Sequence, residues 1–233
     1  MRLTFASYNI HKGVGVDGRR DPERIIAVLR ELQADVIALQ EADRRFGTRE
    51  SVLEKRLLDE TPWRHAPVAK RARSLGWHGN ALLVRRDIEI VAARPLDLPT
   101  LEPRGAARAD LLLEGRHLRV IGMHLDLSGL RRRDQIRHVI SHCDGCGDDV
   151  PTVLMGDFNQ WGQARGAMRE FGDQAWTVLP TGNSFPSRRP LAPLDRIVVS
   201  PGWSCHAAGP HHSALASVAS DHLPIKAVLD LTA

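Results

Sequence analysis

The sequence predicts an α/β fold, and two observations lead to this class. Short apolar runs of strand length, rich in Val, Ile and Leu, recur along the 233 residues. Between several of them lie segments whose apolar residues repeat at helical spacing. The chain shows no repeat, low-complexity tract or linker, so we expect a single domain over residues 1–233.

Local signals define the first elements. LTFASYNI, residues 3–10, is predicted to be a strand and is followed by a Gly-rich turn. A helix is predicted over residues 21–33, because Asp21 is a candidate N-cap, Pro22 occupies the first helical position, and isoleucines and leucines repeat at helical spacing. VIALQE, residues 36–41, is predicted to be a buried strand.

The later elements follow the same signals. A helix is expected around residues 51–60, and the clearest helix covers residues 131–143. Further strands are predicted at residues 80–84, 109–114, 118–127, 150–159, 194–200 and 223–231. Asp221 and His222 directly precede the last of these. Neighbours in a regular strand point to opposite faces, so this pair can share a site only where the backbone is irregular.

The composition is that of an ordinary globular protein, with 42% hydrophobic and 26% charged residues. No apolar run is long enough to span a bilayer and the N-terminus has no apolar signal-like stretch, so we expect a cytoplasmic protein. The net charge is +4 and nearly all basic residues are arginine. Arginines stand together at residues 19–20, 44–45, 85–86, 131–133 and 188–189. Such groups suit phosphate recognition but are more commonly solvated surface.

The three cysteines do not form a disulfide framework, which agrees with a reducing compartment. HCDGCGDD contains one C-x-x-C pair, Cys143 and Cys146. A structural zinc site needs four ligands and no second pair is present, so reduced thiols in a turn are favoured over zinc.

Polar side chains stand at the ends of several predicted strands: Asn9, Glu41, His124, Asp157 and Asn159. Strand ends that face one way can build a site, because the sheet positions side chains from distant parts of the chain. Several oxygen donors there indicate Mg²⁺ or Mn²⁺ more than zinc. Taken alone, each also has a structural explanation: a turn for GDFN, a surface acid for Glu41, a strand cap for Asn9 and a core histidine for His124.

The spacing within GDFN sharpens the expectation of a site. Asp157 and Asn159 lie two residues apart, so on an extended backbone they point to the same side. Gly156, just before them, is expected to leave space for a metal, a water or a phosphate near the backbone.

Seven motifs, in their order and approximate spacing, resemble the endonuclease/exonuclease/phosphatase superfamily. They are SYNIH, LQE, HGNALL, MHL, GDFN, LDRI and SDHLP, and they extend from residue 4 to about residue 226. The resemblance implies a DNase I-like, four-layer α/β/β/α sandwich of two mixed β-sheets. It also implies a phosphoesterase site, dependent on Mg²⁺ (or Mn²⁺), at one edge of the sheets.

The resemblance implies catalytic roles for five residues. His222 is expected to be the general base or the transition-state stabiliser, and Asp195 to orient it; a carboxylate on one imidazole nitrogen fixes the tautomer and supports positive charge on the ring. Asp157 is expected to activate or orient the attacking water, or to protonate the leaving group. Asn159 is expected to hold the phosphate, and His124 to donate to a phosphate oxygen.

The same resemblance implies the metal and substrate contacts. Glu41 is expected to be the principal metal carboxylate, with Asn9 beside it as a neutral oxygen ligand or phosphate contact. Asp221 is expected to help position metal or water. Asn80 and Arg104 are expected to contact the substrate.

The implied reaction is in-line attack of water on a phosphodiester or phosphomonoester, without a covalent enzyme intermediate. SYNIHKG and LQEAD resemble the phosphodiesterase, phosphatase and sphingomyelinase-like members more than the abasic-site endonucleases, which favours a phospholipid-related or small phosphoester substrate. A DNA or RNA nuclease is the alternative, although no aromatic-basic alternation typical of a stacking platform is present.

A scaffold that binds a phosphorylated ligand without hydrolysing it is a second alternative, which the complete set of site residues disfavours. Arg196 stands where relatives often place an aromatic residue or a histidine, so the substrate contacts near Asp195 are left open. No obligate protein partner is evident.

Overall fold

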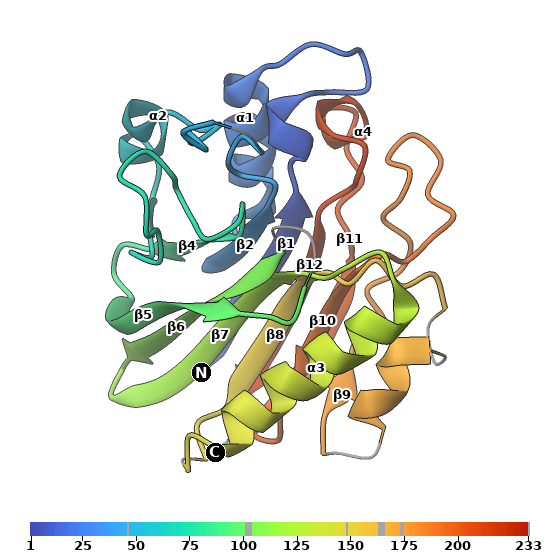
Figure 1. The fold of residues 1–233 in the computed structure, drawn as a ribbon. Coiled ribbons are helices and arrows are strands. Elements are labelled where there is room, and N and C mark those ends of the chain that lie inside the picture. The colour runs from blue at the N-terminus through green and yellow to red at the C-terminus, as the bar shows by residue number, and fades with distance from the viewer. Residues whose placement is uncertain (46, 101–103, 148, 163–165, 173–174, 233) are drawn as a thin grey trace.

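The computed structural model describes residues 1–45, 47–100, 104–147, 149–162, 166–172 and 175–232. Two six-stranded mixed sheets lie face to face, with helices on both outer faces (Figure 1). This is the predicted four-layer α/β/β/α sandwich.

The first sheet has the order β11-β12-β1-β2-β4-β3. In chain order its strands are β1 (Arg2–Asn9), β2 (Val36–Gln40), β3 (Trp63–His65), β4 (Ala81–Arg85), β11 (Trp203–Pro210) and β12 (Ile225–Leu231). Its outer face is covered by α1 (Pro22–Leu32), α2 (Lys55–Asp59) and α4 (Ala216–Ala219), which share one hydrophobic cluster with the sheet. Asp21 caps α1 as predicted, because its carboxylate accepts a hydrogen bond from Arg24 N at 3.0 Å.

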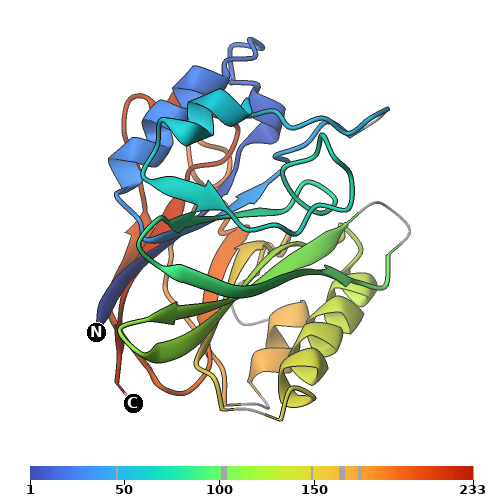
Figure 2. The same ribbon diagram turned by 90° about the vertical axis from the view of Figure 1, so that its left-hand side faces the viewer.

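The second sheet has the order β5-β6-β7-β8-β10-β9. Its strands are β5 (Glu89–Asp97), β6 (Gly105–Leu113), β7 (Arg116–His124), β8 (Thr152–Asp157), β9 (Thr177–Val178) and β10 (Asp195–Val199). The long helix α3 (Gly129–Asp144) and the 3-10 helix η2 (Gly166–Phe171) cover its outer face, away from α1 and α2 (Figure 2).

The core between the sheets ends in the polar residues of the site. Along β1, Phe5 points into the core shared by both sheets, and the two-residue period of the strand places Asn9 on the same face. Along β8, Met155 points into that core and Asp157 follows it on the same face. Along β10, Asp195 precedes the core residue Ile197 in the same way. The inner faces are thus apolar along most of their length and polar at one end.

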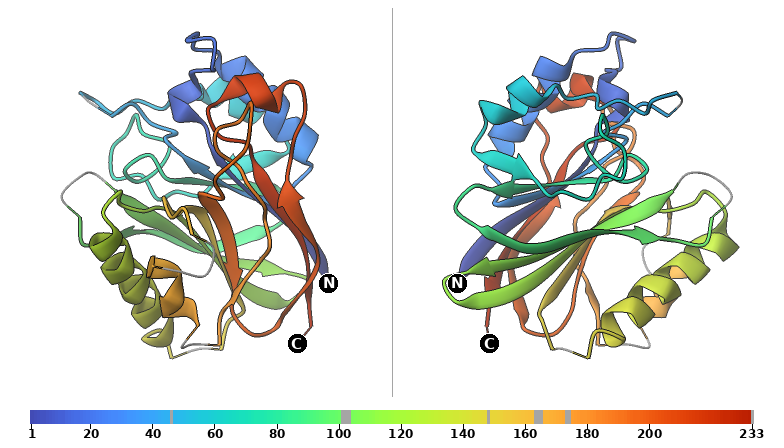
Figure 3. Two further views of the ribbon diagram at one scale, coloured as in Figure 1. Left: turned by 90° about the vertical axis from the view of Figure 1, so that its right-hand side faces the viewer. Right: turned by 60° about the vertical axis from the view of Figure 1, so that its left-hand side comes forward.

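The two termini lie side by side at the other end of the sandwich (Figure 3). β1 pairs antiparallel with β12, which sets Arg2 opposite Asp230. Because β1 starts at the termini and ends at Asn9, the polar end of the core is remote from both termini. Within the described residues, no helix is long and apolar enough to cross a membrane.

Four strands are absent from the sequence-based prediction, namely β3, β5, β9 and β11, and each lies at the edge of a sheet. In addition, α2 covers only residues 55–59 of the helix predicted around residues 51–60. The other predicted helices and strands are present, with ends that differ by a few residues.

Candidate active site

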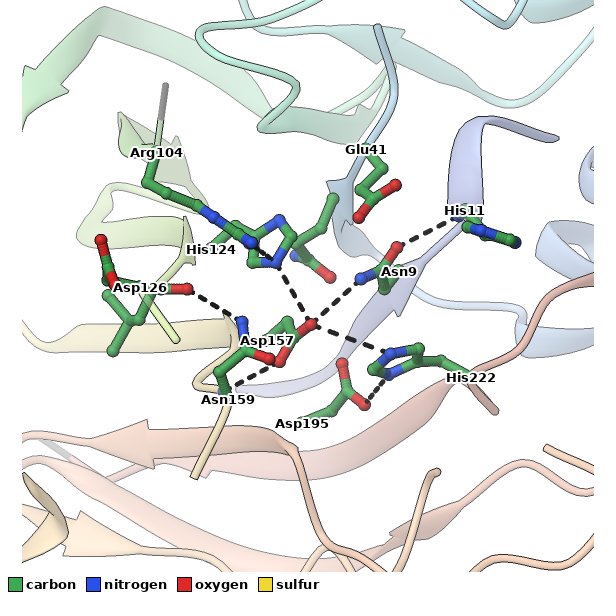
Figure 4. A network of polar contacts seen from close by, with 12 residues as sticks. Asn9, His11, Glu41, Arg104, His124, Asp126, Asp157, Asn159, Asp195 and His222 are labelled. Atoms are coloured by element: carbon green, nitrogen blue, oxygen red, sulfur yellow. Dashed lines mark hydrogen bonds and ion pairs between the residues drawn. The ribbon is translucent and has the colours of Figure 1, made fainter. Parts of the chain in front are cut away.

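Strand register brings the predicted site residues to one edge of the sandwich (Figure 4). Asp157 lies opposite His124 in the parallel pair β7–β8 and opposite Asp195 in the antiparallel pair β8–β10. Asn9 ends β1 in the facing sheet. Side chains that are up to 186 positions apart in the chain therefore converge because strand ends coincide.

Asp157 is the centre of the cluster and is 1% exposed. Its Oδ2 accepts a hydrogen bond from Asn9 Nδ2 at 3.0 Å. The same oxygen lies 3.3 Å from His124 Nε2 and 3.9 Å from His222 Nε2. One buried carboxylate oxygen thus faces two imidazoles and one amide.

His222 is held by a second buried acid. Its Nδ1 lies 2.8 Å from Asp195 Oδ2, and Ser184 Oγ donates to the same oxygen at 2.5 Å. Burial disfavours the charged ring, but Asp195, followed by Asp157, outweighs it and raises the pKa of His222 to about 10. At neutral pH the ring is an imidazolium, with Nδ1–H directed to Asp195 and Nε2–H on the side of Asp157.

The chain before β12 is irregular, as the adjacent Asp221 and His222 require. β12 begins only at Ile225, so both residues precede the strand. Ser220 Oγ donates to the carbonyl oxygen of Asn9 at 2.7 Å and ties this segment to the end of β1. Asp221 is half-exposed and its Oδ1 lies 3.8 Å from His11 Nδ1, next to the buried cluster.

His124 has the opposite protonation state to His222. Burial lowers the pKa of His124 to about 3, although Asp157 opposes this effect, and the charge of Arg104 lowers it further. The Arg104 guanidinium contacts His124 Nε2 directly. The site therefore holds one charged and one neutral imidazole on the same carboxylate oxygen.

Two expectations for GDFN were wrong in their geometry. β8 ends at Asp157 and Asn159 has a left-handed φ of 51°, so the two residues do not lie on one extended backbone. They are close because Asn159 N donates to Asp157 Oδ1 at 2.9 Å, while Asn159 Nδ2 donates to Leu125 O at 2.9 Å. Gly156 leaves no room for a ligand: a Cβ there would lie 1.9 Å from Met123 O of the neighbouring strand.

Glu41 follows β2 with a left-handed φ of 55°. Its carboxylate forms an ion pair with Lys12 Nζ, and Lys12 also has a left-handed φ, of 58°. Neighbouring Asn9 Oδ1 accepts a hydrogen bond from His11 N at 3.1 Å. Lys12 was missed by the sequence reasoning, although it directly follows the SYNIH motif.

The donors around Glu41 fit a hard divalent cation. The Lys12 contact shows that the Glu41 carboxylate faces a position where positive charge is stabilised. Carboxylate and amide oxygens suit Mg²⁺, which keeps several waters and commonly uses only one or two protein carboxylates. A separate group of donor atoms, those of Asp157, Asp195 and His222, lies within 4.8 Å, but Asp195 and His222 already bind each other.

Asn80 and Arg196 both serve the framework around the site. Asn80 is fully buried and its Nδ2 donates to Gly105 O at 2.9 Å, while its Oδ1 has no hydrogen-bond partner in the described part of the chain. Arg196 points away from the site, because it alternates with Asp195 along β10. Its guanidinium donates to the carbonyl oxygens of Asp195 and Gln160, each at 3.2 Å. Arg196 thus adds no charge to the inner face.

The C-x-x-C pair lies elsewhere, at the end of α3. Cys143 is buried, and Cys146 Sγ lies 2.9 Å from Arg108 Nη1. Across the described ranges, the only metal-like group of three or more His, Cys, Asp or Glu is Asp157, Asp195 and His222, so this pair is not part of such a group.

Comparison with known proteins identifies the family of this chain. The model of the Endonuclease/Exonuclease/phosphatase family matches residues 6–222. The chain belongs to this family. Its members are hydrolases that act on phosphoester bonds. The predicted superfamily is confirmed.

Individual relatives cover nearly the whole chain. The chain is 29% identical to the uncharacterized protein YbhP of Escherichia coli K12, over 96% of this chain and 94% of that protein. An endonuclease/exonuclease/phosphatase family protein from Bacteroides thetaiotaomicron has a TM-score of 0.78 at 18% identity and covers 98% of both chains. A mannosyl-6-phosphatase from the same organism has a TM-score of 0.75 at 19% identity, with 98% and 99% coverage. These two structures show the shared fold.

Proposed function

We propose that this protein hydrolyses a phosphodiester or phosphomonoester by direct attack of water, with Mg²⁺ or Mn²⁺ as cofactor. One observation carries the proposal: His222 Nε2 and the Asp157 carboxylate lie 3.9 Å apart in a buried cluster, with Asp195 2.8 Å from the other ring nitrogen of His222. A proton acceptor and a cationic donor that converge on one point suit water attack on a phosphoryl group.

His222 is assigned the role of transition-state stabiliser. Asp195 occupies Nδ1, which leaves Nε2–H as the one donor available to a phosphate oxygen. An imidazolium that donates to a non-bridging oxygen stabilises the negative charge that develops there. A ring whose pKa is raised to about 10 is poorly suited to accept a proton from water at neutral pH, which favours this role over that of general base.

Asp157 is assigned the role of orienting the attacking water and accepting its proton. Asn9 Nδ2 holds Oδ2, and Asn159 N holds Oδ1, so both oxygens have fixed directions. His124 Nε2 faces the same Oδ2 and also contacts the Arg104 guanidinium, and we assign His124 and Arg104 to contact the phosphate. Asn159 is assigned as a further phosphate contact.

Glu41 and Asn9 would hold the cation, with Asp221 acting on its water shell. When bound, a divalent cation polarises a phosphoryl oxygen and stabilises charge on the leaving oxygen. Glu41 contributes the carboxylate, and the cation would take the position at that carboxylate that the Lys12 ammonium holds. Asn80 is assigned to shape the substrate pocket. It directly precedes β4, and its Nδ2 donates to the carbonyl oxygen of Gly105, which begins β6 next to Arg104.

The neighbours support the reaction class and leave its substrate open. A mannosyl-6-phosphatase acts on a phosphomonoester, human nocturnin carries a bound sulfate, and zebrafish TDP2 has been solved with single-stranded DNA product. For this chain we favour a small or lipid-related phosphoester, and DNA or RNA is the alternative.

A hydrolysis panel tests the proposal. The substrates are bis-(p-nitrophenyl) phosphate, p-nitrophenyl phosphate and an abasic-site DNA duplex, each with Mg²⁺, Mn²⁺ or EDTA. We expect cation-dependent turnover that falls by about 10³-fold or more in His222→Gln. His211→Gln is the matched control, because His211 pairs with Glu31 at the surface. A folded, Mg²⁺-binding protein that turns over none of these substrates, nor a phospholipid diester, would contradict the proposal.

A further inference from the structure

A cavity opens beside the catalytic cluster and carries an excess of positive charge. Its empty space of about 490 Å³ includes open solvent, and its wall includes Glu41 and His124 of the site. Its cationic lining consists of Lys12, Arg44, Arg45, Arg49 and Arg104. Its acidic lining consists of Glu41 and Asp43.

The two acids are already engaged. Glu41 forms its ion pair with Lys12. The buried Asp43 carboxylate accepts hydrogen bonds from Leu75 N at 2.7 Å and Gly76 N at 3.3 Å, so it fixes the loop that forms one wall. Arg44 in turn lies 3.9 Å from Glu50, and the cationic side chains of the wall outnumber its two acids.

Two of the arginines are directed by neutral histidines. Arg49 Nη1 lies 2.8 Å from His78 Nδ1, and Arg104 contacts His124 Nε2. Burial, and next to it the charge of Arg49, lowers the pKa of His78, so this ring accepts a hydrogen bond from Arg49 without neutralising it. Arg49 and His78 both have a left-handed φ of 50°, a conformation that costs non-glycine residues free energy, so the surrounding structure must hold both positions.

We propose that this cavity binds a second phosphoryl group of the substrate, so that the substrate is a small molecule with two phosphoryl groups close together. This inference rests on the proposed function, since the scissile group would lie at Asp157 and His222. Arginine suits the role because its planar fork binds two oxygens of a phosphate at once.

A compact ligand fits this lining better than a nucleic-acid strand. Base binding without sequence readout relies on aromatic side chains for stacking, and no Phe, Tyr or Trp of the described residues lines the cavity. Arg44 and Arg45 are one of the adjacent arginine pairs noted in the sequence. Both line this cavity beside the site.

Equilibrium binding tests the inference separately from catalysis. Isothermal titration calorimetry in EDTA compares methylenediphosphonate, which has two phosphoryl groups, with methylphosphonate, which has one. We expect the wild-type protein to bind the first about tenfold or more tightly than the second, and Arg49→Gln to reduce this ratio to about threefold or less. Arg49→Lys should retain an intermediate ratio, because it keeps the charge and loses the fork.

Arg30→Gln is the control, because Arg30 is an exposed arginine on α1 that does not line the cavity; it should keep the wild-type ratio. A wild-type ratio near one, or an unaltered ratio in a folded Arg49→Gln protein, would overturn the inference while leaving hydrolysis of simple phosphoesters intact. Displacement of methylenediphosphonate by a short oligonucleotide at lower concentration than by a sugar bisphosphate would also overturn it, in favour of nucleic acid. Preference for two phosphoryl groups without any hydrolysis would instead count against the proposed function alone.

Discussion

The charge of His222 is the property of the site most open to a decisive test, through Asp195→Asn. Asp195 is fully buried and its Oδ2 accepts hydrogen bonds from His222 and Ser184. Asparagine has nearly the same shape and can still accept a hydrogen bond, but it carries no charge. Burial lowers the pKa of His222, and in the variant the charges that still raise it are those of Asp157 and Asp221.

The expected effect is large. A rise in the pKa of His222 from 6.5 to about 10 corresponds to an interaction on the order of 5 kcal/mol. Because the folded-state pKa is raised, this stabilisation is fully present below pH 6.5 and is lost as the pH rises through about 10. We expect Asp195→Asn to lower the pKa of His222 by about 2 units or more, and to destabilise the protein most below pH 6.5.

The assay is an NMR titration of the histidine ring carbons in metal-free protein, with His222→Gln to assign the signal. Ser184→Ala is the matched control, since it removes a hydrogen bond to the same oxygen but leaves the carboxylate, and it should shift the pKa of His222 far less. Turnover of Asp195→Asn should fall by about 10² to 10⁴. A wild-type His222 that titrates near 7, or one whose titration is unaffected by Asp195→Asn, would refute the assigned role.

Three further outcomes are expected. Glu41→Gln should weaken Mg²⁺ binding by about tenfold or more in calorimetry and reduce turnover, and an unchanged affinity would place the cation elsewhere. Arg196→Ala should cost about 1 to 3 kcal/mol in urea unfolding, because it removes a buried guanidinium that donates to the carbonyl oxygens of Asp195 and Gln160; a loss below about 0.5 kcal/mol would contradict this. A thiol reagent at pH 8 should modify the exposed Cys205 in the native protein, whereas Cys143, which is buried and has its pKa raised to about 12, should react only after unfolding.

The interior of both sheets was predictable from the sequence, and their edges were not. Interior strands such as β2 and β10 are buried on both faces and read as continuous apolar runs. Edge strands bury few side chains. β11 has no buried residue, and in β5 the single buried residue is Leu96. β3 and β9 are too short for a periodic signal. The pairing of these strands is set by the neighbouring strand, which a local reading of the chain does not include.

The site was predictable at its strand ends and less so in its loops. Asn9 and Asp157 occupy the last positions of buried strands, where apolar periodicity locates them, whereas Asp195, the first residue of β10, was indicated by the family resemblance. The contacts of Lys12 and Ser184 depend on loop paths that carry no periodic signal. Their residue types are also common in turns, so each has an ordinary local explanation.

The position of the site at the end of the inter-sheet core has an energetic consequence. Asp157, Asp195 and His222 are each 5% exposed or less, so their partners are protein groups rather than bulk water, and His222 is the charged partner of Asp195. Removal of one member leaves its partner buried and unpaired, which costs more than the lost contact itself. A double-mutant cycle with Asp195→Asn and His222→Gln should therefore be strongly non-additive, with the double variant little less stable than the worse single variant. Additive losses would show that the two residues are stabilised independently, and the coupled site inferred from their 2.8 Å contact would then be wrong.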